Sequence, residues 1–394
     1  MSAPILIPPP LSLYVHLPWC LRKCPYCDFN SYVARGGLPF DDYIDALIRD
    51  LEFDSQFVLE RPIHSVFFGG GTPSLFPPEM LDRFLQAASR RLRFAPAIEI
   101  TLETNPGTAE HARFDRYLAA GINRMSIGIQ TFDNGCLQRL GRIHDGNEAE
   151  YAVKHAQDAG FDNINLDLMY ALPGQTLSMA EADLAHAFAL SPAHISHYQL
   201  TLEPNTRFSA QPPEGLPDED SAWDMQEHCQ RMLADMGYIH YEISAYARPD
   251  RQCRHNLNYW RFGDYLGIGA GAHGKLTLGA EQSVLRRCKV RHPAAYLTHA
   301  GKEKGIHSDE YVATMDRPFE FMLNALRLHE GFDLRHFEQR TGVSRSAIAP
   351  ALAVAYARGW LTTAEERVAP TEHGLRFAND VIGLFNGSLP VSNN

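Results

Sequence analysis

The sequence predicts an α/β protein: a partial (β/α)6-type barrel followed by a C-terminal α+β domain that is winged-helix-like. Two observations predict it. Short apolar runs alternate with helix-like spacers over about the first 200 residues, which is typical of parallel βαβ units with right-handed crossovers. The 394-residue chain also exceeds the roughly 250–300 residues at which single cores usually divide. A doubly wound sheet stays open as the alternative.

Six apolar runs are the predicted strands. They cover Leu11–Leu17, Ser65–Phe68, Ile98–Leu102, Met125–Ile129, Ile164–Met169 and Ile195–Leu200. The spacers between them place apolar residues three or four positions apart, and this period indicates amphipathic helices. The helices are expected over Asp42–Glu52, Glu79–Arg91, Ala109–Ala120, Glu148–Ala159 and Met179–Leu190.

Glycine and polar residues follow each predicted strand. Strand one runs into Pro18-Trp19-Cys20, strand two into Gly69-Gly70-Gly71-Thr72, and strand six into Glu203-Pro204-Asn205-Thr206. Strand three ends at Glu103, strand four ends at Gln130, and strand five carries Asp167. Any one such residue can simply end a strand. Because the carboxyl ends of barrel strands form the active-site mouth, six consecutive strands with such endings predict a functional site there.

Three domains are expected. Residues 1–210 form the barrel core, 211–310 a linker and barrel extension, and 311–394 the winged-helix-like domain. The last segment holds eight arginines, nine acids and no lysine. Since a wing that reads DNA is expected to be basic, a packing or partner-docking role is favoured.

Composition narrows the function classes. The chain is 45% hydrophobic with a net charge of −11, so it is globular and an even surface of this charge repels phosphate backbones. We therefore expect no nucleic-acid partner. No apolar run approaches the ~18–20 residues of a membrane span, and the N-terminus lacks the basic region of a secretory signal. A cytoplasmic protein is expected, with contact with the inner membrane through a partner as an open alternative.

Cysteine usage is the most informative feature. Seven cysteines in a long chain without an export signal argue against a disulfide framework. Cys20, Cys24 and Cys27 form a C-x3-C-x2-C cluster, whereas four others are isolated and are expected to be small, inert side chains: Cys136, Cys229, Cys253 and Cys288.

The cluster predicts a metal centre with an open position. Structural zinc takes four Cys or His ligands, and a [4Fe–4S] cluster normally takes four thiolates. Three thiolates leave one position for another ligand. His16 could be a fourth ligand, although strand alternation favours pointing it into the barrel.

The C-x3-C-x2-C loop after the first strand resembles the hallmark of the radical S-adenosylmethionine (SAM) family. The resemblance implies that Cys20, Cys24 and Cys27 ligate three irons of a [4Fe–4S] cluster. SAM would chelate the fourth iron, and an electron from the cluster could split the sulfonium to give a 5′-deoxyadenosyl radical.

Within that family, Phe67–Ser74 is similar to the glycine-rich strand of the oxygen-independent coproporphyrinogen III oxidase branch. By this resemblance, nine residues are implied to flank the cluster or contact SAM. Without this resemblance, the sequence context would predict that Arg142 is a solvated helix residue and that Glu103 pairs with a neighbouring Lys or Arg. The nine residues are Tyr14, Tyr26, Gly70, Gly71, Thr72, Glu103, Gln130, Arg142 and Asp167.

Two features indicate a sub-branch. The oxidases carry a further Cys two places after the third cluster Cys, where this chain has Phe29. Residues 255–260 fit the H-N-x-x-Y-W motif of the heme-chaperone branch, in which that motif is associated with heme binding. The resemblance makes His255, Asn256, Tyr259 and Trp260 heme-binding candidates. A capped helix end with a buried aromatic pair is the simpler reading of this segment.

The functional expectation is a heme chaperone that holds a [4Fe–4S] cluster, SAM and heme, and delivers heme to apo-hemoproteins, including respiratory ones. The alternative is an enzyme, the oxygen-independent coproporphyrinogen III oxidase, which decarboxylates propionates with a 5′-deoxyadenosyl radical. The identity of the acceptor, the cleavage of SAM, the heme axial ligand and a homodimeric state stay open.

Overall fold

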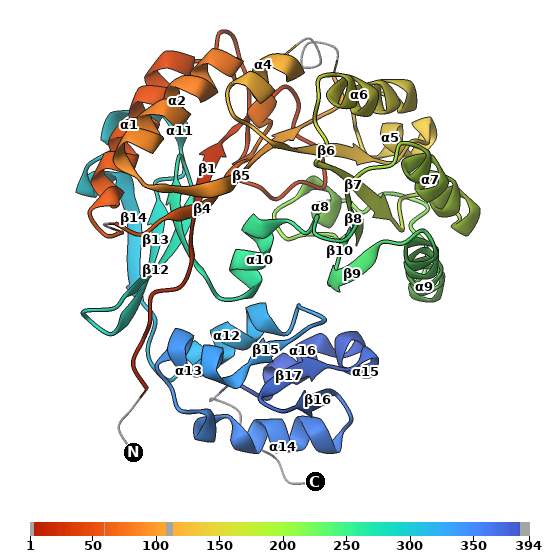
Figure 1. Ribbon diagram of the computed structural model, residues 1–394. Coiled ribbons are helices and arrows are strands. Elements are labelled where there is room, and N and C mark those ends of the chain that lie inside the picture. Colours follow the sequence, from red (N-terminus) through yellow and green to blue (C-terminus); the bar gives the residue numbers. More distant parts are fainter. Residues whose placement is uncertain (1–3, 59, 108–112, 387–394) are drawn as a thin grey trace.

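The computed structural model describes residues 4–58, 60–107 and 113–386 (Figure 1). Its main body is a 12-stranded sheet in the order β14-β13-β12-β11-β1-β4-β5-β6-β7-β8-β10-β9. Six central strands are parallel and follow chain order, as the sequence predicts: β1 (Leu11–Leu17), β4 (Ile63–Gly70), β5 (Phe94–Thr104), β6 (Arg124–Gln130), β7 (Ile164–Tyr170) and β8 (His194–Gln199).

The sheet is curved and open, and it does not close into a barrel (Figure 1). The order of the six central strands has no reversal, so the structure is the expected partial barrel and the doubly wound alternative is wrong. The crossover helices follow one another along the outer face of the sheet, and α1 contacts α2, α2 contacts α4 and α4 contacts α6. They are α1 (Phe40–Ser55), α2 (Pro78–Arg91), α4 (Phe114–Ala119), α6 (Gly146–Asp158) and α7 (Leu177–Ala189).

Helix positions agree with the sequence pattern, and local capping explains where they begin. The Asp145 side chain accepts from the backbone N–H of Glu148 and the Glu148 side chain accepts from that of Asp145, a capping box that starts α6. Thr176 caps α7 through its hydroxyl. A short helix, α5 (Asn134–Arg139), adds to the predicted set. Residues 109–112 of the predicted helix 109–120 lie outside the described residues.

The segment expected to extend the barrel supplies both edges of the sheet. On one side β11 runs parallel to β1 and begins an antiparallel meander, and on the other side β10 pairs with β8. The helix α9 (Glu219–Asp235) packs on α7, and α10 (Arg254–Trp260) lies against β4. The edge strands are β9 (Ile239–Glu242), β10 (Ala245–Ala247), β11 (Asp264–Ile268), β12 (His273–Leu278), β13 (Ser283–Lys289) and β14 (Ile306–Tyr311).

The smaller elements surround this sheet. The strands β2 (Trp19–Cys20) and β3 (Tyr32–Val33) pair with each other and close the loop that carries the three cysteines. The helix α11 (Pro293–His299) packs on α1. Three short helices are the remaining elements of the main body: η1 (Pro73–Leu75), α8 (Arg207–Ala210) and η2 (Glu303–Gly305).

A buried ionic cluster fastens β13 to α1. The Lys289 ammonium lies 2.6 Å from Asp50 and 2.7 Å from Asp54, and all three side chains are at most 3% exposed. The Arg287 guanidinium lies 2.6 Å from Asp54 and 2.7 Å from Asp309. These contacts compensate charges that would otherwise be costly to bury.

The C-terminal segment has its own apolar core, which Phe262 from the main body joins. Its helices are followed by the hairpin β16–β17, an order that agrees with the winged-helix-like α+β domain that the sequence predicts. The boundaries at 210 and 310 stay predictions. The elements are α12 (Arg317–Ala325), β15 (Phe332–Asp333), α13 (Leu334–Thr341), η3 (Arg345–Ala347), α14 (Ala349–Ala357), β16 (Leu361–Ala364), β17 (Arg367–Pro370), α15 (Glu372–Arg376) and α16 (Ala378–Gly383).

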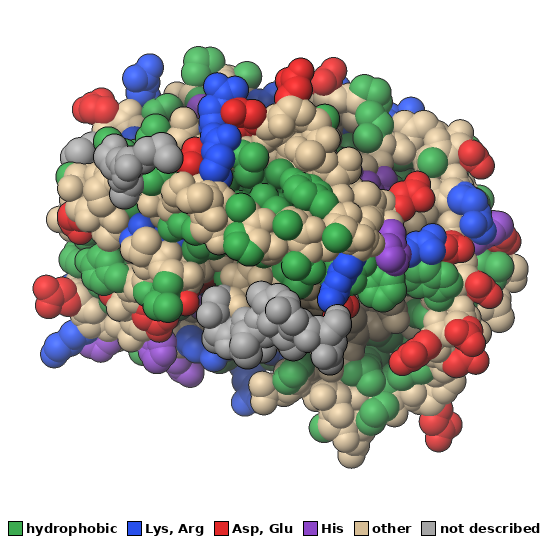
Figure 2. Space-filling view, turned by 90° about the horizontal axis from the view of Figure 1, so that it is seen from below, with side chains coloured by type: hydrophobic (Ala, Val, Ile, Leu, Met, Phe, Trp, Pro, Cys, Tyr) green, Lys and Arg blue, Asp and Glu red, His purple; other side chains and the backbone are tan. Residues whose placement is uncertain are grey.

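The surface seen from below carries acidic and basic side chains interspersed with hydrophobic ones (Figure 2). Within the residues that the structure describes, none of the helices combines the length and the apolarity that a membrane span would require.

Candidate functional site

The three clustered cysteines lie on one loop at the carboxyl end of β1. Backbone bonds close this loop, since Tyr32 N donates to Pro18 O at 2.7 Å and Ala34 N donates to Cys20 O at 2.9 Å. Cys20, Cys24 and Cys27 are free thiols, and all three line one cavity of about 330 Å³. The loop therefore presents three soft ligands to a single space.

The donor set fits an iron–sulfur cluster in type and placement. Burial is the largest cause that raises the pKa of Cys20 and of Cys27, so these thiols stay protonated until a metal takes the thiolate form. Among the described residues, no three His, Cys, Asp or Glu side chains converge tightly enough to hold a single metal ion. The fit rests on three thiols that share one cavity.

The same cavity collects eight of the nine residues implied to contact the cluster or SAM. The parallel strands bring these residues together because their carboxyl ends lie on one edge of the sheet. Tyr14 instead lines a neighbouring cavity, which shares Gly70 and Glu103 with the first. The eight are Tyr26, Gly70, Gly71, Thr72, Glu103, Gln130, Arg142 and Asp167.

Arg142 is not the solvated helix residue that its sequence context suggested. It follows α5 in a loop, and its Nη2 donates to Asn105 Oδ1 at 2.6 Å and to Gly128 O at 2.8 Å. Its Nη1 lies 3.5 Å from Cys24 Sγ, and its Nε is buried with no hydrogen-bond partner in the described structure. The guanidinium thus spans the cysteine loop and the strand ends.

Glu103 and Asp167 give the cavity an acidic wall. Burial, followed by the nearby Asp167 carboxylate, raises the pKa of Glu103 to about 8. Burial also raises the pKa of Asp167. Glu103 accepts a hydrogen bond from Gly70 N at 3.2 Å, and the described structure records no ion pair for it. This wall would favour a ligand with a cationic group, because a nearby positive charge stabilises the ionised carboxylate.

Gly70 and Gly71 are required by packing as well as by ligand approach. Gly70 has a φ of 119°, and a Cβ there would lie 2.6 Å from a ring carbon of His16. A Cβ on Gly71 would lie 2.4 Å from Trp19 O. Only glycine lets β4 pass so close to β1 and the start of the cysteine loop.

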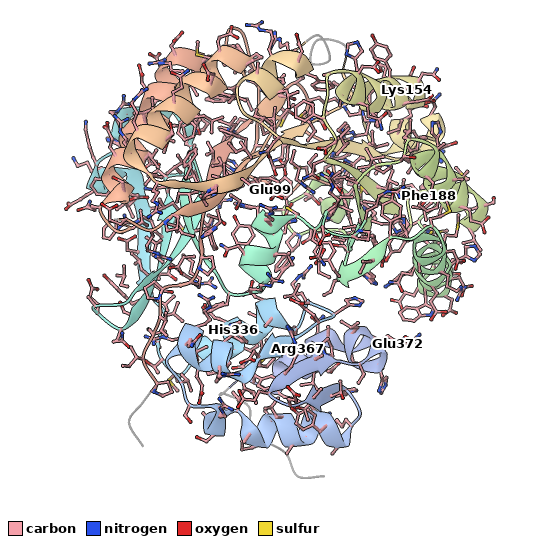
Figure 3. All side chains as sticks on the ribbon, in the orientation of Figure 1. Glu99, Lys154, Phe188, His336, Arg367 and Glu372 are labelled. Atoms are coloured by element: carbon pink, nitrogen blue, oxygen red, sulfur yellow. The ribbon has the colours of Figure 1, made fainter. Side chains whose placement is uncertain are left out.

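The H-N-x-x-Y-W segment forms α10, and the structure explains why the helix begins there. The Glu99 carboxylate on β5 accepts from the backbone N–H groups of Arg254 at 3.1 Å and His255 at 3.0 Å, and it faces the start of α10 in Figure 3. An acidic group at a helix N-terminus satisfies free N–H groups and the helix dipole.

The four heme-binding candidates do not face one space. His255 is buried at 1% exposure, with Nδ1 at 2.9 Å from Ser65 Oγ and Nε2 at 2.8 Å from Tyr259 Oη. Tyr259 and Trp260 line the neighbouring cavity, whereas His255 and Asn256 do not. Burial, then the charge of Arg124, lowers the pKa of His255 to about 3, so the ring is neutral. Their part in heme binding stays a prediction.

The neighbouring cavity measures about 490 Å³ and shares Phe29, Gly70 and Glu103 with the cysteine cavity. Sequence reasoning missed most of its wall, because the wall comes from edge strands and from α12, which only the tertiary fold brings together. The glycine-rich stretch 267–274, which includes Gly271 and His273 of this wall, was the available signal in the sequence. His16 lines this cavity too, in agreement with the expectation that it points into the barrel. The missed residues are Asn30, Phe262, Gly263, Tyr265, Gly271, His273, Lys275, Arg286, Arg291 and Asn324.

Fold and site together define a radical SAM protein. The radical SAM superfamily model matches residues 14–187, and the HemN C-terminal domain model matches residues 313–377. The fold is similar to that of coproporphyrinogen III oxidase (HemN) from Escherichia coli, with a TM-score of 0.81 and 23% identity, covering 97% of this chain and 91% of that one.

Curated relatives are more similar in sequence. The heme chaperone HemW of Haemophilus influenzae is 48% identical over 381 residues, covering 96% of this chain and 98% of the relative. The heme chaperone HemW of Escherichia coli is 47% identical over 377 residues, with the same coverage. The chain belongs to the HemW family of the radical SAM superfamily.

Proposed function

We propose that this protein is a heme chaperone, which binds a [4Fe–4S] cluster, SAM and heme and delivers heme to apo-hemoproteins. The observation that carries the proposal is the pair of adjoining cavities. One contains three cysteine thiols and an acidic wall, and the other has aromatic walls and cationic side chains. The names of the curated relatives support the same function.

In this proposal Cys20, Cys24 and Cys27 hold the cluster and leave one iron for SAM. When bound, the cluster and SAM supply one-electron reduction of a sulfonium. Arg142 offers a guanidinium to the SAM carboxylate, and Glu103 offers a carboxylate to its ammonium group. Gln130 and Asp167 are assigned to the ribose hydroxyls, and Gly70, Gly71 and Thr72 to the methionyl group. Tyr14 and Tyr26 flank the two cofactors.

Phe29 is the residue that argues against coproporphyrinogen oxidation. It stands where the oxidase branch has a cysteine, it is 59% exposed, and it lines both cavities. A large exposed phenyl ring at this position offers an apolar face in place of a thiol. Such a face suits contact with a flat apolar macrocycle.

One anaerobic preparation of reconstituted protein tests the function. Heme titration is expected to saturate at a defined stoichiometry, and mixing with an apo-hemoprotein is expected to transfer that heme. Incubation with SAM, a reductant and coproporphyrinogen III is expected to give no protoporphyrinogen. Catalytic turnover of coproporphyrinogen, or failure to load any acceptor, would overturn the proposal.

The acceptor and the place of delivery belong to the same proposal. We expect a cytoplasmic chaperone that reaches the inner membrane only through an acceptor. Parallel transfer assays with a water-soluble apo-hemoprotein and a membrane-bound respiratory one test this, and transfer to the soluble acceptor alone would exclude the respiratory assignment. Light scattering before and after heme loading tests for a homodimer.

A further inference from the structure

We propose that the 490 Å³ cavity is the heme seat, with His273 as the axial ligand of the iron and Arg291 as a partner of a propionate. This inference rests on the proposed heme-binding function and deepens it, because it assigns the iron to a histidine outside the H-N-x-x-Y-W segment.

The cavity has a volume and lining side chains that suit a porphyrin. Ligand pockets for molecules of this kind measure about 300–1,000 Å³, and this cavity falls within that range. Aromatic side chains supply flat faces for the macrocycle. One of them is the exposed Phe29 from the cysteine loop, and the others are Tyr14, Tyr259, Trp260 and Tyr265.

Among the described residues, three histidines lie at or behind this cavity, and one of them offers an accessible ring. His16 is 5% exposed, with Nδ1 at 3.0 Å from Tyr14 Oη and Nε2 at 2.9 Å from Asn30 O. Both ring nitrogens of the buried His255 are also hydrogen bonded, to Ser65 and Tyr259. His273 is exposed and lines the cavity. An iron ligand needs a free lone pair, and His273 can provide it without breaking the buried network of either other ring.

The surroundings of His273 leave its ring available to a metal. His273 pairs with Cys288 across the antiparallel strands β12 and β13, and Cys288 Sγ lies 3.1 Å from Nδ1 and 3.9 Å from Nε2. A thiol is a weak hydrogen-bond partner, so iron can compete for the ring.

The cations of the cavity indicate where the propionates lie. Lys275 is buried and bonds Asp264 at 3.0 Å, and Arg286 pairs with Glu320 at 2.8 Å. Arg291 is exposed, and the described structure records no ion pair for its guanidinium. Its backbone carbonyl accepts from Asn30 Nδ2 at 3.0 Å, which fixes it beside the cysteine loop. Arginine can bind a carboxylate with two parallel hydrogen bonds, so Arg291 is the cation best suited to a propionate.

The test is heme titration of the full-length, cluster-reconstituted protein, read by the Soret and visible bands and by redox titration of the bound heme. Four variants are compared with the wild type: His273→Ala, His255→Ala, Cys288→Ser and Arg291→Ala. His64→Ala is the matched control, because His64 is an exposed histidine on β4 that does not line the cavity. Circular dichroism confirms that each variant is folded.

Loss of a group beside a metal ligand costs about 10–100-fold in affinity, so His273→Ala is expected to weaken heme binding at least that much and to abolish the histidine-ligated spectrum. Cys288→Ser is expected to keep the stoichiometry and shift the heme potential. Arg291→Ala is expected to weaken binding about tenfold without changing the spectrum. His255→Ala and His64→Ala are expected to keep the wild-type spectrum.

The inference would be overturned if folded His273→Ala kept the wild-type heme spectrum while folded His255→Ala lost it. The proposed heme-chaperone function would still stand in that case. Loss of heme binding in Cys288→Ser alone would also overturn the inference, because it would indicate that the Cys288 thiolate ligates the iron. If the wild-type protein binds no heme, the proposed function and this inference both fail.

Discussion

Nη1 of Arg142 lies 3.5 Å from Sγ of Cys24. The two residues are more than a hundred positions apart, yet the loop after α5 places the guanidinium against the middle cysteine of the cluster motif. Because the other arm of that guanidinium is anchored on Asn105 and Gly128, Arg142 is held in place before any ligand binds. A preorganised cation of this kind favours an anionic group in the cavity.

Replacing Arg142 with alanine is expected to weaken SAM binding by about tenfold or more, since hydrogen bonds to charged groups contribute about 1.5–3 kcal/mol. The measurement is equilibrium dialysis of SAM with cluster-reconstituted protein. Arg116→Ala is the control, because Arg116 is exposed and pairs with Glu79 on the outer helices at 2.9 Å. Equal SAM affinity in the two variants would contradict the role given to Arg142.

Substituting Cys20, Cys24 or Cys27 with alanine is expected to abolish cluster assembly, because each thiolate is assigned to a separate iron. Iron and sulfide content and visible absorbance of anaerobically reconstituted protein measure the loss. Cys288→Ser is the control, since Cys288 is partly exposed and lies outside the cysteine loop. A full complement of iron in any of the three alanine variants would remove that cysteine from the ligand set.

Glu103→Gln is expected to stabilise the SAM-free protein at alkaline pH. The pKa of Glu103 is about 8 in the fold against an ordinary 4.5, so between these values the folded state binds more protons than the unfolded state. Stability therefore falls as pH rises through this window. The Glu103→Gln variant lacks this penalty, which is of the order of a few kcal/mol.

The apparent Tm at pH 5, 7 and 9 measures this effect. The difference between Glu103→Gln and the wild type is expected to be small at pH 5 and largest at pH 9. A constant difference across the series would mean that the Glu103 carboxyl does not titrate in this window.

Lys289→Met is expected to destabilise the fold by about 3–5 kcal/mol, because it leaves the buried Asp50 carboxylate without a counter-charge and Asp54 with Arg287 alone. Lys154→Met is the control. Lys154 lies on α6 (Figure 3). It is 57% exposed and pairs with Glu150 one turn away, an arrangement that contributes about 0.3–0.5 kcal/mol. Urea unfolding measures the free energy of unfolding of both variants. Equal losses of stability in Lys289→Met and Lys154→Met would show that β13 does not depend on this ionic cluster.

The local pattern of apolar residues predicted many of the helices and strands of this protein. β1 begins and ends at the predicted residues, and α2 and α6 differ from prediction by one or two positions, because apolar periodicity reports directly which face of an element is buried. The parallel order of the strands followed from the length of their connections. The edge strand β11 was not predicted, since its pairing with β1 joins residues some 250 positions apart.

The cysteine loop shows how much of the candidate site could be predicted from the sequence. The spacing of Cys20, Cys24 and Cys27 indicated a metal centre with an open position, and the strand-end rule indicated that Glu103 and Asp167 would share its cavity. The candidate residues of the H-N-x-x-Y-W segment do not all reach the cavity. His255 and Tyr259 lie one turn apart on the same helix face, but His255 is buried against Ser65 while Tyr259 and Trp260 line the cavity.

The sequence by itself determined the six parallel strands, the cysteine loop and the family, because each depends on short-range spacing or on motifs read along the chain. Only the tertiary structure decided three features: Arg142 touches Cys24, Glu103 is partly buried with no ion pair among the described residues, and His273 faces the second cavity while His255 does not. Burial, pKa and ligand access depend on which distant residues surround a group. Those neighbours come from edge strands and from the C-terminal segment, and they are fixed only when the chain folds.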